Sequence, residues 1–513
     1  METKRKLVRA TTGMALITAL SRLSGWLRDK VVAAHLGAEG MGDAFVAGFR
    51  APNLFRQLLA EGALHATFIP TLAEVEKSGC EEEVRSFVRA MTTTLAVLAG
   101  VVVLLGMWQA EPFADILAPD YRSIPEKHAA TVYFTRWFFP YLAFISLAAL
   151  AQGVLNVRGR FLLSAATPIF LNASIAGSVL AAWWLSQPYA PWLVAGVLAG
   201  GFLQFATQWV AGVRLGVPLV PGRGAFRHPQ VRVVLRKALP LLFSSGIYPL
   251  TVFLATYLAS SAGDGALFCV YAASRINELV YGVIVVQLAT ALLPTLAVDE
   301  KASETFSFAV RLQSFVVLPA MVFLVVLSRE VAGLLFGGGR FGPWAVATTG
   351  QALVAFAAGM PALAFGKLAS GRFFAVHDTR SPVYASLLGL AIFAGFGFFL
   401  TPRFGAPGVA AAASLSQYAG GLYLGWALRR AGQSVGKEVA PSLWRHGLAA
   451  AVMAGFLAIM AERVAFPVTT SVRGAATVAV TGILGFGVYL VALWALRTRE
   501  VAELSRLLAR KKR

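Results

Sequence analysis

The sequence predicts an all-α polytopic membrane protein of about 14 transmembrane helices. These form two six-helix bundles related by pseudo-two-fold symmetry along the membrane normal, plus two C-terminal helices. Three observations support this fold class. Of 513 residues, 57% are hydrophobic and 14% charged, whereas soluble domains carry about 25% charged residues. Apolar runs of bilayer length recur along the chain, and the two halves of the chain share short sequence patterns.

The apolar runs are each near the length of about 20 residues that a helix needs to cross a bilayer. Lipid offers the backbone no hydrogen-bond partners, so we expect these runs to be helical. They fall at 10–34, 43–72, 84–108, 130–157, 161–186, 192–215, 231–262, 266–298, 305–327, 344–374, 382–400, 408–428, 444–460 and 474–496.

The second run is expected to be broken and polar. Pro52 and Asn53 lie in its middle, and Glu61 and Gly62 interrupt it again. Broken helices at membrane depth are tolerated where they line a cavity or are buried in protein.

Basic residues predict the orientation. By our count about 30 lie in loops on one side and roughly 7 on the other, and the basic side of a membrane protein is cytoplasmic. We therefore expect a multi-pass protein of the bacterial cytoplasmic (inner) membrane with both termini in the cytoplasm. The first run is interrupted by Arg22 and Arg28, which favours a retained helix over a signal peptide. The formal charge of +20 comes from short loops and indicates no nucleic-acid surface.

The two halves resemble each other at an offset of six helices. The short sequence segments around Pro70 and Pro294 are similar, and short basic turns precede both Pro168 and Pro382. An even offset gives both halves the same orientation in the membrane. We predict a six-helix bundle over 1–220, a second over 221–430, and two further helices with a basic cytoplasmic tail over 431–513.

Charged residues within the runs are the candidate functional residues, because each costs about 2.5–3.5 kcal/mol at the bilayer centre and is kept where it meets water, a partner or a substrate. They concentrate in the first, second and eighth runs, where a cleft between two bundles would lie. The set comprises Arg22, Arg28, Asp29, Asp43, Arg50, Arg56, Glu61, Arg275 and Glu278.

Four of these arginines could hold a pyrophosphate, since guanidinium donates two parallel hydrogen bonds to phosphate and stays charged. The four are Arg22, Arg28, Arg56 and Arg275. Ser21 and Ser24 share a helix face with Arg28, which predicts a polar stripe along this helix. The alternative is structural pairing: Arg28 with Asp29 or Asp43, Arg56 with Glu61, and Arg275 with Glu278. Lys367 could bind substrate or pair structurally. Arg50 is expected to be structural or to extend its charged end to the membrane–water interface.

Several of these segments resemble the signature of the bacterial lipid II flippase (MurJ, or MviN) family. The matching words are Ser21-Arg-Leu-Ser-Gly-Trp-Leu-Arg-Asp, Gly42-Asp-Ala-Phe, Arg50-Ala-Pro-Asn-Leu-Phe-Arg-Gln-Leu-Leu-Ala-Glu-Gly-Ala, Phe68-Ile-Pro-Thr-Leu-Ala-Glu, Tyr271-Ala-Ala-Ser-Arg-Ile-Asn-Glu and Leu292-Leu-Pro-Thr-Leu-Ala. The chain length, the helix count and two extra terminal helices are similar as well.

The resemblance implies the multidrug/oligosaccharidyl-lipid/polysaccharide exporter superfamily and alternating access. It also implies export of an undecaprenyl-pyrophosphate-linked peptidoglycan precursor. By motif position, Arg22, Arg28, Arg56 and Arg275 would line a cationic cavity, supported by Asp43 and Glu61, and the last two helices would form a groove for the lipid tail. Some family members bind sodium through an acid in the seventh helix, but 231–262 contains no carboxylate. Membrane potential is therefore the expected driver.

Alternative functions remain open at this point. The chain could export another lipid-linked oligosaccharide of the O-antigen type, or cationic drugs. A drug exporter would need acidic residues in its cavity that are not paired with arginine, and this chain lacks them. A membrane enzyme would need a cluster of acids, histidines or metal ligands in its outer loops, and the candidates are Asp115, Asp120 and Glu126. The simpler interpretation is that these three acids belong to a solvated loop. We expect no enzyme activity, no cofactor and no metal. The expected partners are lipid II and membrane lipids, with no nucleic acid, and the chain is expected to be a monomer that works alongside cell-wall synthesis proteins.

Overall fold

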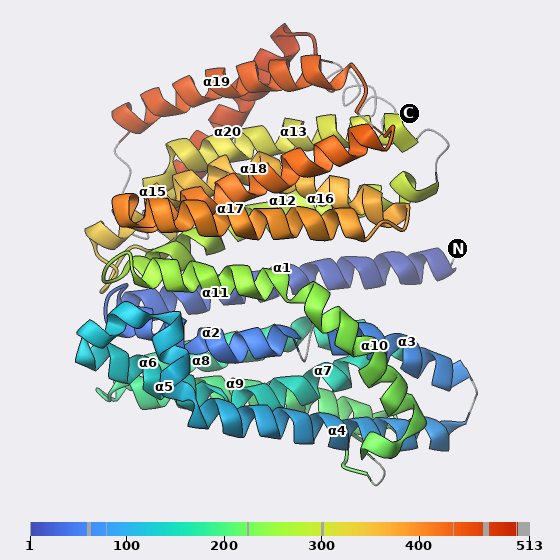
Figure 1. Cartoon of the computed structure of the whole chain (residues 1–513). Helices are drawn as coiled ribbons and strands as arrows, with labels where there is room; N and C mark the ends of the chain where they lie inside the picture. The colour runs from blue at the N-terminus through green and yellow to red at the C-terminus, as the bar shows by residue number, and fades with distance from the viewer. Residues whose placement is uncertain are drawn as a thin grey trace. The chain divides into compact units, whose positions relative to one another are not determined.

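The computed structural model describes residues 2–58, 63–77, 80–222, 225–298, 302–433, 435–464, 471–498 and 500. The chain divides into two compact units, Met1–Ser260 and Ser261–Arg513. Both units are built from helices (Figure 1), which confirms the all-α fold class.

The first unit contains α1 to α11 and two short 3₁₀ helices. Their bounds are α1 Glu2–Leu36, α2 Met41–Arg56, α3 Ala63–Lys77, α4 Glu81–Trp108, α5 Ala110–Leu117, η2 Pro119–Ser123, α6 Pro125–Phe138, α7 Tyr141–Val157, α8 Phe161–Trp184, α9 Tyr189–Arg214, η3 Ala225–Arg227, α10 Pro229–Ser245 and α11 Ile247–Ser260.

The second unit contains α12 to α20. Their bounds are α12 Ala266–Val298, α13 Ala302–Val326, α14 Ser328–Phe336, α15 Pro343–Ala358, α16 Met360–Ala375, α17 Arg380–Phe404, α18 Ala406–Arg430, α19 Val439–Arg463 and α20 Val472–Ala495.

Every predicted apolar run contains one helix or a broken pair of helices. The pairs are α2 with α3, α6 with α7, α10 with α11, and α15 with α16, the last bent by 41°. Among the described residues, eight helices are long and apolar enough to cross a membrane, or nine if the bent pair counts as one span. The chain is therefore a multi-pass membrane protein, and the number fourteen stays a prediction.

Two short helices lie where the sequence analysis expected only loops. α5 and α14 each follow a long apolar helix within its unit, α4 and α13 respectively. Each has eight or nine residues, too few for a span. Their brevity hid them from a search for long apolar runs.

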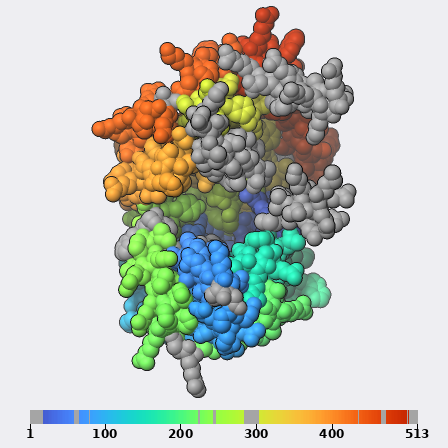
Figure 2. Space-filling view, turned by 90° about the vertical axis from the view of Figure 1, so that its right-hand side faces the viewer, coloured from blue at the N-terminus to red at the C-terminus, as the bar shows by residue number. Residues whose placement is uncertain are grey.

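The core of the first unit includes a cluster where α3, α4 and α7 meet α10. Phe68, Phe87 and Val231 are among its buried members. In Figure 2 the light green of α10 lies beside the blue of α3 and α4. Arg158, in the turn between α7 and α8, connects this turn to two other loops. It donates to Glu76 at 2.8 Å and to Glu81 at 3.0 Å, on either side of the α3–α4 loop, and to the Leu215 carbonyl after α9 at 2.6 Å. The basic turn 158–160 and the segment 215–222 therefore lie at the same end of this unit.

A buried ionic cluster holds α13, α19 and the segment after α20 together in the second unit. Arg311 Nη1 donates to Glu500 Oε1 at 3.2 Å, and His446 Nε2 lies 3.4 Å from Glu500 Oε2. Glu500 is 3% exposed. Burial raises the pKa of Glu500, but the hydrogen bond from His446 and the charge of Arg311 outweigh it and lower that pKa to about 2.

We expect Glu500→Gln to destabilise the second unit by about 1.5–3 kcal/mol near neutral pH, because it removes the charged partner of a buried arginine. A carboxyl with a lowered folded pKa contributes stability above its unfolded value of 4.5, and this is lost as pH falls toward about 2. Thermal unfolding in detergent should therefore show a wild-type midpoint that drops between these pH values. If the unfolding midpoint of Glu500→Gln drops over the same pH range as that of the wild type, another titratable group causes the acid sensitivity.

One hydrogen bond occurs at matching places in the two units. The Gly222 N–H donates to Thr93 Oγ1 at 2.8 Å, and the Gly436 N–H donates to Ser307 Oγ at 2.8 Å; both pairs are 129 residues apart. A duplicated six-helix bundle would produce such a coincidence, and the repeat and its boundaries at 220 and 430 stay a prediction.

Candidate functional site

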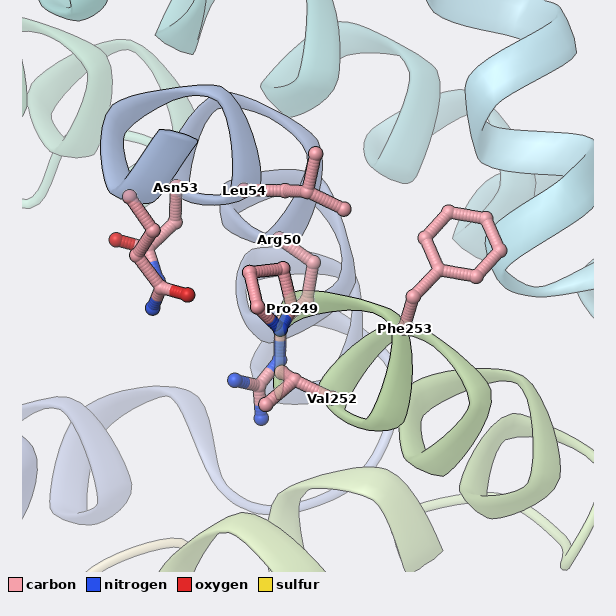
Figure 3. Close-up of a pocket in the computed structure, with 7 residues that line it drawn as sticks. Arg50, Asn53, Leu54, Pro249, Val252 and Phe253 are labelled. Atoms are coloured by element: carbon pink, nitrogen blue, oxygen red, sulfur yellow. The ribbon is translucent and has the colours of Figure 1, made fainter. Parts of the chain in front are cut away.

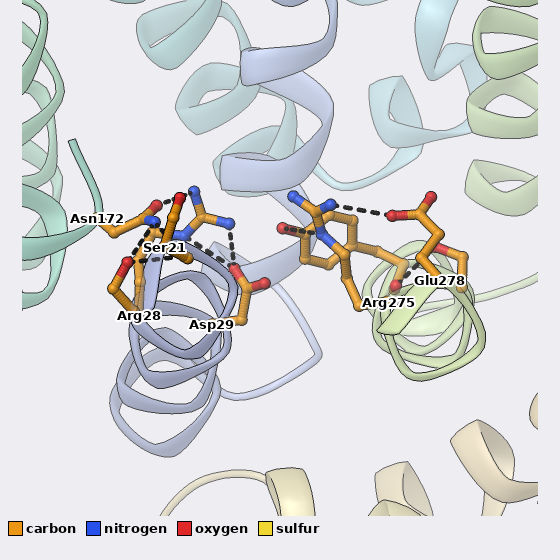
Figure 4. Close-up of polar contacts among 9 residues, drawn as sticks. Ser21, Arg28, Asp29, Asn172, Arg275 and Glu278 are labelled. Atoms are coloured by element: carbon orange, nitrogen blue, oxygen red, sulfur yellow. Dashed lines mark hydrogen bonds and ion pairs between the residues drawn. The ribbon is translucent and has the colours of Figure 1, made fainter. Parts of the chain in front are cut away.

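Arg28 on α1 is the most enclosed of the four predicted arginines. Its Nε and Nη2 donate to Asp29 Oδ1 at 2.9 and 2.6 Å, and its Nη1 donates to Asn172 Oδ1 of α8 at 3.1 Å. Arg28 is 9% exposed and Asp29 is 5% exposed. Figure 4 shows the guanidinium lying between the two partners. The acid that pairs with Arg28 is thus its sequence neighbour.

Asn172 also fixes the face of α1 that carries Arg28. Its amide Nδ2 donates to Ser24 Oγ at 2.9 Å and to the Ser21 carbonyl at 3.4 Å. The predicted polar stripe of Ser21, Ser24 and Arg28 therefore faces α8. Asn172 was missed because only charged residues were sought, although an asparagine inside the apolar run 161–186 was a usable signal.

Two other predicted basic residues lie outside these hydrogen bonds. Arg22 is half-buried on α1, and it has no hydrogen-bond or ion-pair partner among the described residues. Lys367 is exposed on α16 in the second unit. Neither cation is neutralised by a described acid.

Asp43 is enclosed in an ion pair that the sequence analysis did not foresee. Lys127 Nζ of α6 donates to Asp43 Oδ2 of α2 at 2.6 Å and lies 3.8 Å from the centroid of the Tyr121 ring. Asp43 is 0% and Lys127 3% exposed. α2 can approach α6 because of Gly48, where a Cβ would lie 2.5 Å from Phe134 Cβ. Lys127 lies just before the predicted run 130–157, which is why it was overlooked.

Arg56 ends α2 beside the break in this segment. Its Nε donates to Asn53 Oδ1 at 2.7 Å. The backbone widens into a π-helical turn at Gln57 and Leu58, a feature that is frequent at functional sites. The predicted residue Glu61 lies outside the described residues.

Arg275 on α12 pairs with Glu278 of the same helix. Its Nη1 donates to Glu278 Oε2 at 3.0 Å, and its Nε donates to the Tyr271 hydroxyl at 3.2 Å. Unlike Arg28, this pair is accessible, with side chains 41% and 51% exposed. Figure 4 shows the Arg275 guanidinium pointing toward the Glu278 carboxylate.

Described acids pair with two of the four predicted arginines, each within its own unit. Asp29 and Glu278 pair with Arg28 and Arg275, whereas Asp43 pairs with Lys127. A pyrophosphate that links two groups carries a negative charge on each phosphate, and guanidinium groups match its oxygens. Arginines already oriented by neutral and acidic partners can bind such a group without first being ordered.

Asp115, in the acidic segment after α4, is engaged in local ion pairs. Asp115 of α5 accepts hydrogen bonds from Arg122 and, at 2.9 Å, from His128. The hydrogen bond from Arg122 holds the pKa of Asp115 below its usual range, the opposite of what a general acid at neutral pH requires. Among the described residues, no group of three or more His, Cys, Asp or Glu could hold a metal ion.

Comparisons with known proteins agree on one family. The model of the lipid II flippase MurJ family matches residues 32–476. The probable lipid II flippase MurJ of Rhizobium meliloti (strain 1021) is 34% identical over 481 residues, covering 90% of this chain and 88% of the relative. The lipid II flippase MurJ of Burkholderia cenocepacia is 32% identical over 439 residues, covering 83% of this chain and 84% of the relative.

Solved structures show the same fold. A lipid II flippase MurJ in an inward closed conformation has a TM-score of 0.80 at 20% identity, covering 94% of this chain and 99% of that chain. An inward-facing MATE multidrug resistance transporter of the MOP superfamily has a TM-score of 0.63 at 15% identity, covering 81% of this chain and 98% of that chain. The family match over most of the sequence separates these two kinds of transporter. The chain belongs to the lipid II flippase MurJ family.

Proposed function

We propose that this flippase carries lipid II from the inner to the outer leaflet by alternating access, and that Arg22, Arg28, Arg56 and Arg275 bind the pyrophosphate. The observation that carries the proposal is Arg28, a buried guanidinium on α1 whose three nitrogens are held by Asp29 and Asn172. A buried arginine without partners would be costly. Asp29 offsets that cost while the site is empty, and the phosphates take over as acceptors when substrate binds.

Several further residues would support the four arginines, each in a different way. Ser21 and Asp29 orient Arg28, Glu278 orients Arg275, and Lys367 adds positive charge in the second unit. Asp43 supports the site indirectly by fixing α2 against α6, and Glu61 is proposed as a further supporting acid. The repeated bundles would be 1–220 and 221–430, with 431–513 adding two helices and a basic tail.

The proposed setting is the cytoplasmic (inner) membrane, with both termini in the cytoplasm. The excess of basic residues in the loops of one side supports this orientation. We propose a monomer that transports without a catalytic step, driven by the membrane potential acting on the arginines. Proteins of cell-wall synthesis would supply and consume its substrate.

The test is conditional depletion of the flippase in a native host, with lipid II measured in each leaflet. Wild type should restore growth and outward lipid II, whereas Arg275→Ala should fail, because losing a charge-assisted bond costs about 1.5–3 kcal/mol of substrate binding. Glu278→Gln is the matched control, since it removes the acid and keeps the arginine; it should restore growth. Equal failure of both variants would make the pair structural, and normal lipid II export after depletion would overturn the proposed function.

A further inference from the structure

The cavity between α2 and α11 is too small for part of a substrate, since it has room for about one water molecule. Figure 3 shows Arg50 extending from α2 toward Val252 of α11 beside this cavity. A group of buried titratable side chains lies instead in the second unit, where α13, α19 and α20 pack against one another (Figure 1). It includes His446 of α19, which is 0% exposed and which the proposed transport does not use. The ligand that a histidine binds near neutral pH is a proton.

Each ring nitrogen of His446 faces one polar side chain. Nε2 lies 3.4 Å from Glu500 Oε2, and Nδ1 lies 2.8 Å from Ser314 Oγ of α13. A bare lone pair on Nε2 would face a carboxylate oxygen, so Nε2 carries a hydrogen in either charge state of the ring. The neutral ring therefore accepts a hydrogen bond at Nδ1 from the Ser314 hydroxyl. Nδ1 is then the atom whose lone pair can take up a proton.

Ser314 allows this proton to bind without the loss of a hydrogen bond. A hydroxyl has one hydrogen and two lone pairs, so it can donate in one state and accept in the other. Its Oγ also lies 2.7 Å from the Arg311 carbonyl oxygen of the same helix. When Nδ1 binds a proton and donates it to Ser314, the Ser314 hydrogen turns to that carbonyl. Every donor in this chain of contacts keeps an acceptor in both states.

The charges around His446 show what the bound proton would strengthen. From α13, Arg311 Nη1 donates to Glu500 Oε1 at 3.2 Å, which leaves Oε2 to His446. From α20, Tyr489 interacts electrostatically with Glu500, and a phenol carries no charge near pH 7. On α19 itself, Arg445 is exposed. Proton uptake thus makes the contact between the ring and the carboxylate charge-assisted, and Glu500 then lies between two cations.

The segment that Glu500 anchors leaves α20 through a strained turn. Arg497 has a φ of 49°, a left-handed conformation that residues other than glycine disfavour. Its N–H donates to the Trp494 carbonyl at 3.0 Å, and the Thr498 N–H donates to the Leu493 carbonyl at 3.2 Å, which is the pattern of a Schellman cap. Because this turn is strained, it depends on the contacts that hold Glu500 beyond it.

We propose that His446 is a proton-binding site that controls how tightly the segment after α20 is docked. The proton comes from solvent, binds Nδ1 and raises the charge of the ring by one. The charged ring then holds Glu500, and with it the turn at Arg497, more tightly. In the proposed orientation the cluster lies near the cytoplasmic end of its helices, so the proton comes from the cytoplasm. The inference does not depend on what the chain transports.

The test is amide hydrogen exchange of Arg497 and Thr498, measured in the full-length chain in lipid nanodiscs between about pH 8 and pH 5, where imidazole titrates. Exchange in wild type is compared with exchange in His446→Gln at the same pH, so that the chemical dependence of exchange on pH cancels. Glutamine keeps an N–H donor for Glu500 and binds no proton. As the pH falls, protection of both amides in wild type should rise by about 3- to 10-fold relative to the variant, the gain from a charge-assisted bond. A ratio that does not change with pH overturns the proposal.

Arg445→Gln is the matched control, since Arg445 donates to the Arg497 carbonyl at 3.5 Å from an exposed position beside His446. It should change exchange by the same factor at every pH. Glu500→Gln tests the link from the other side and serves also if His446→Gln does not fold: without a carboxylate for the charged ring, its ratio to wild type should show the same dependence on pH. A flat ratio for Glu500→Gln, or a pH-dependent one for Arg445→Gln, would assign the proton to another group.

Discussion

Arg28→Ala should weaken lipid II binding by about 10- to 150-fold, the equivalent of about 1.5–3 kcal/mol for charge-assisted hydrogen bonds, and should abolish flipping in a reconstituted leaflet assay. The physical reason is the preset geometry of this guanidinium, which Asp29 and Asn172 hold on all three nitrogens. Arg28→Lys should recover part of the affinity, because an ammonium keeps the charge and loses the planar fork. Binding would be measured by titration of lipid II into nanodiscs.

Asp29→Asn is the control that separates substrate binding from structural pairing. It removes the acid and leaves the arginine hydrogen-bonded to Asn172, so affinity for an anionic lipid should be kept or increased. Thermal unfolding of both variants would be recorded in parallel. If Arg28→Ala and Asp29→Asn lose binding equally, with the same drop in thermal stability, the arginine is half of a structural ion pair and the proposed role is wrong.

Lys127→Met should destabilise the first unit by about 3–5 kcal/mol, the usual cost of leaving one member of a buried ion pair without its partner. Asp43 is fully buried, so its carboxylate would lose the ammonium at 2.6 Å with no access to solvent. The lost contact between Lys127 and the Tyr121 ring adds to this. Chemical unfolding in detergent, followed by tryptophan fluorescence, would measure the effect.

The double variant Asp43→Leu with Lys127→Met tests whether the pair acts as a unit. Buried ion pairs can be replaced by apolar residues of similar volume with little loss, so the double variant should recover most of the stability lost in Lys127→Met. The coupling energy follows from the complete double-mutant cycle. Purely additive effects of the two substitutions would show that each residue is stabilised by other contacts. Flipping by a stable double variant would place the role of Asp43 in holding α2 against α6.

The sequence by itself determined which segments are helical and which residues carry charge within them. Hydrophobic runs near bilayer length depend only on local composition, so all of them contain helices. The break expected at Pro52 and Asn53 was wrong, because both residues lie inside α2, which continues to Arg56; Glu61 and Gly62 lie outside the described residues. The stripe of Ser21, Ser24 and Arg28 followed from helical periodicity, because the angle between residues of one helix is set by local geometry. The family signature lies in these same segments.

The long-range partners of the charged residues came from the tertiary structure, whereas the local pairs Arg28–Asp29 and Arg275–Glu278 were among those that the sequence had offered. Asp43 meets Lys127, 84 residues away, and Arg28 meets Asn172, 144 residues away. No local rule selects such pairs, because they depend on which helices pack together and at what rotation. Periodicity acts within one helix, whereas a binding site is assembled from side chains that several helices bring together.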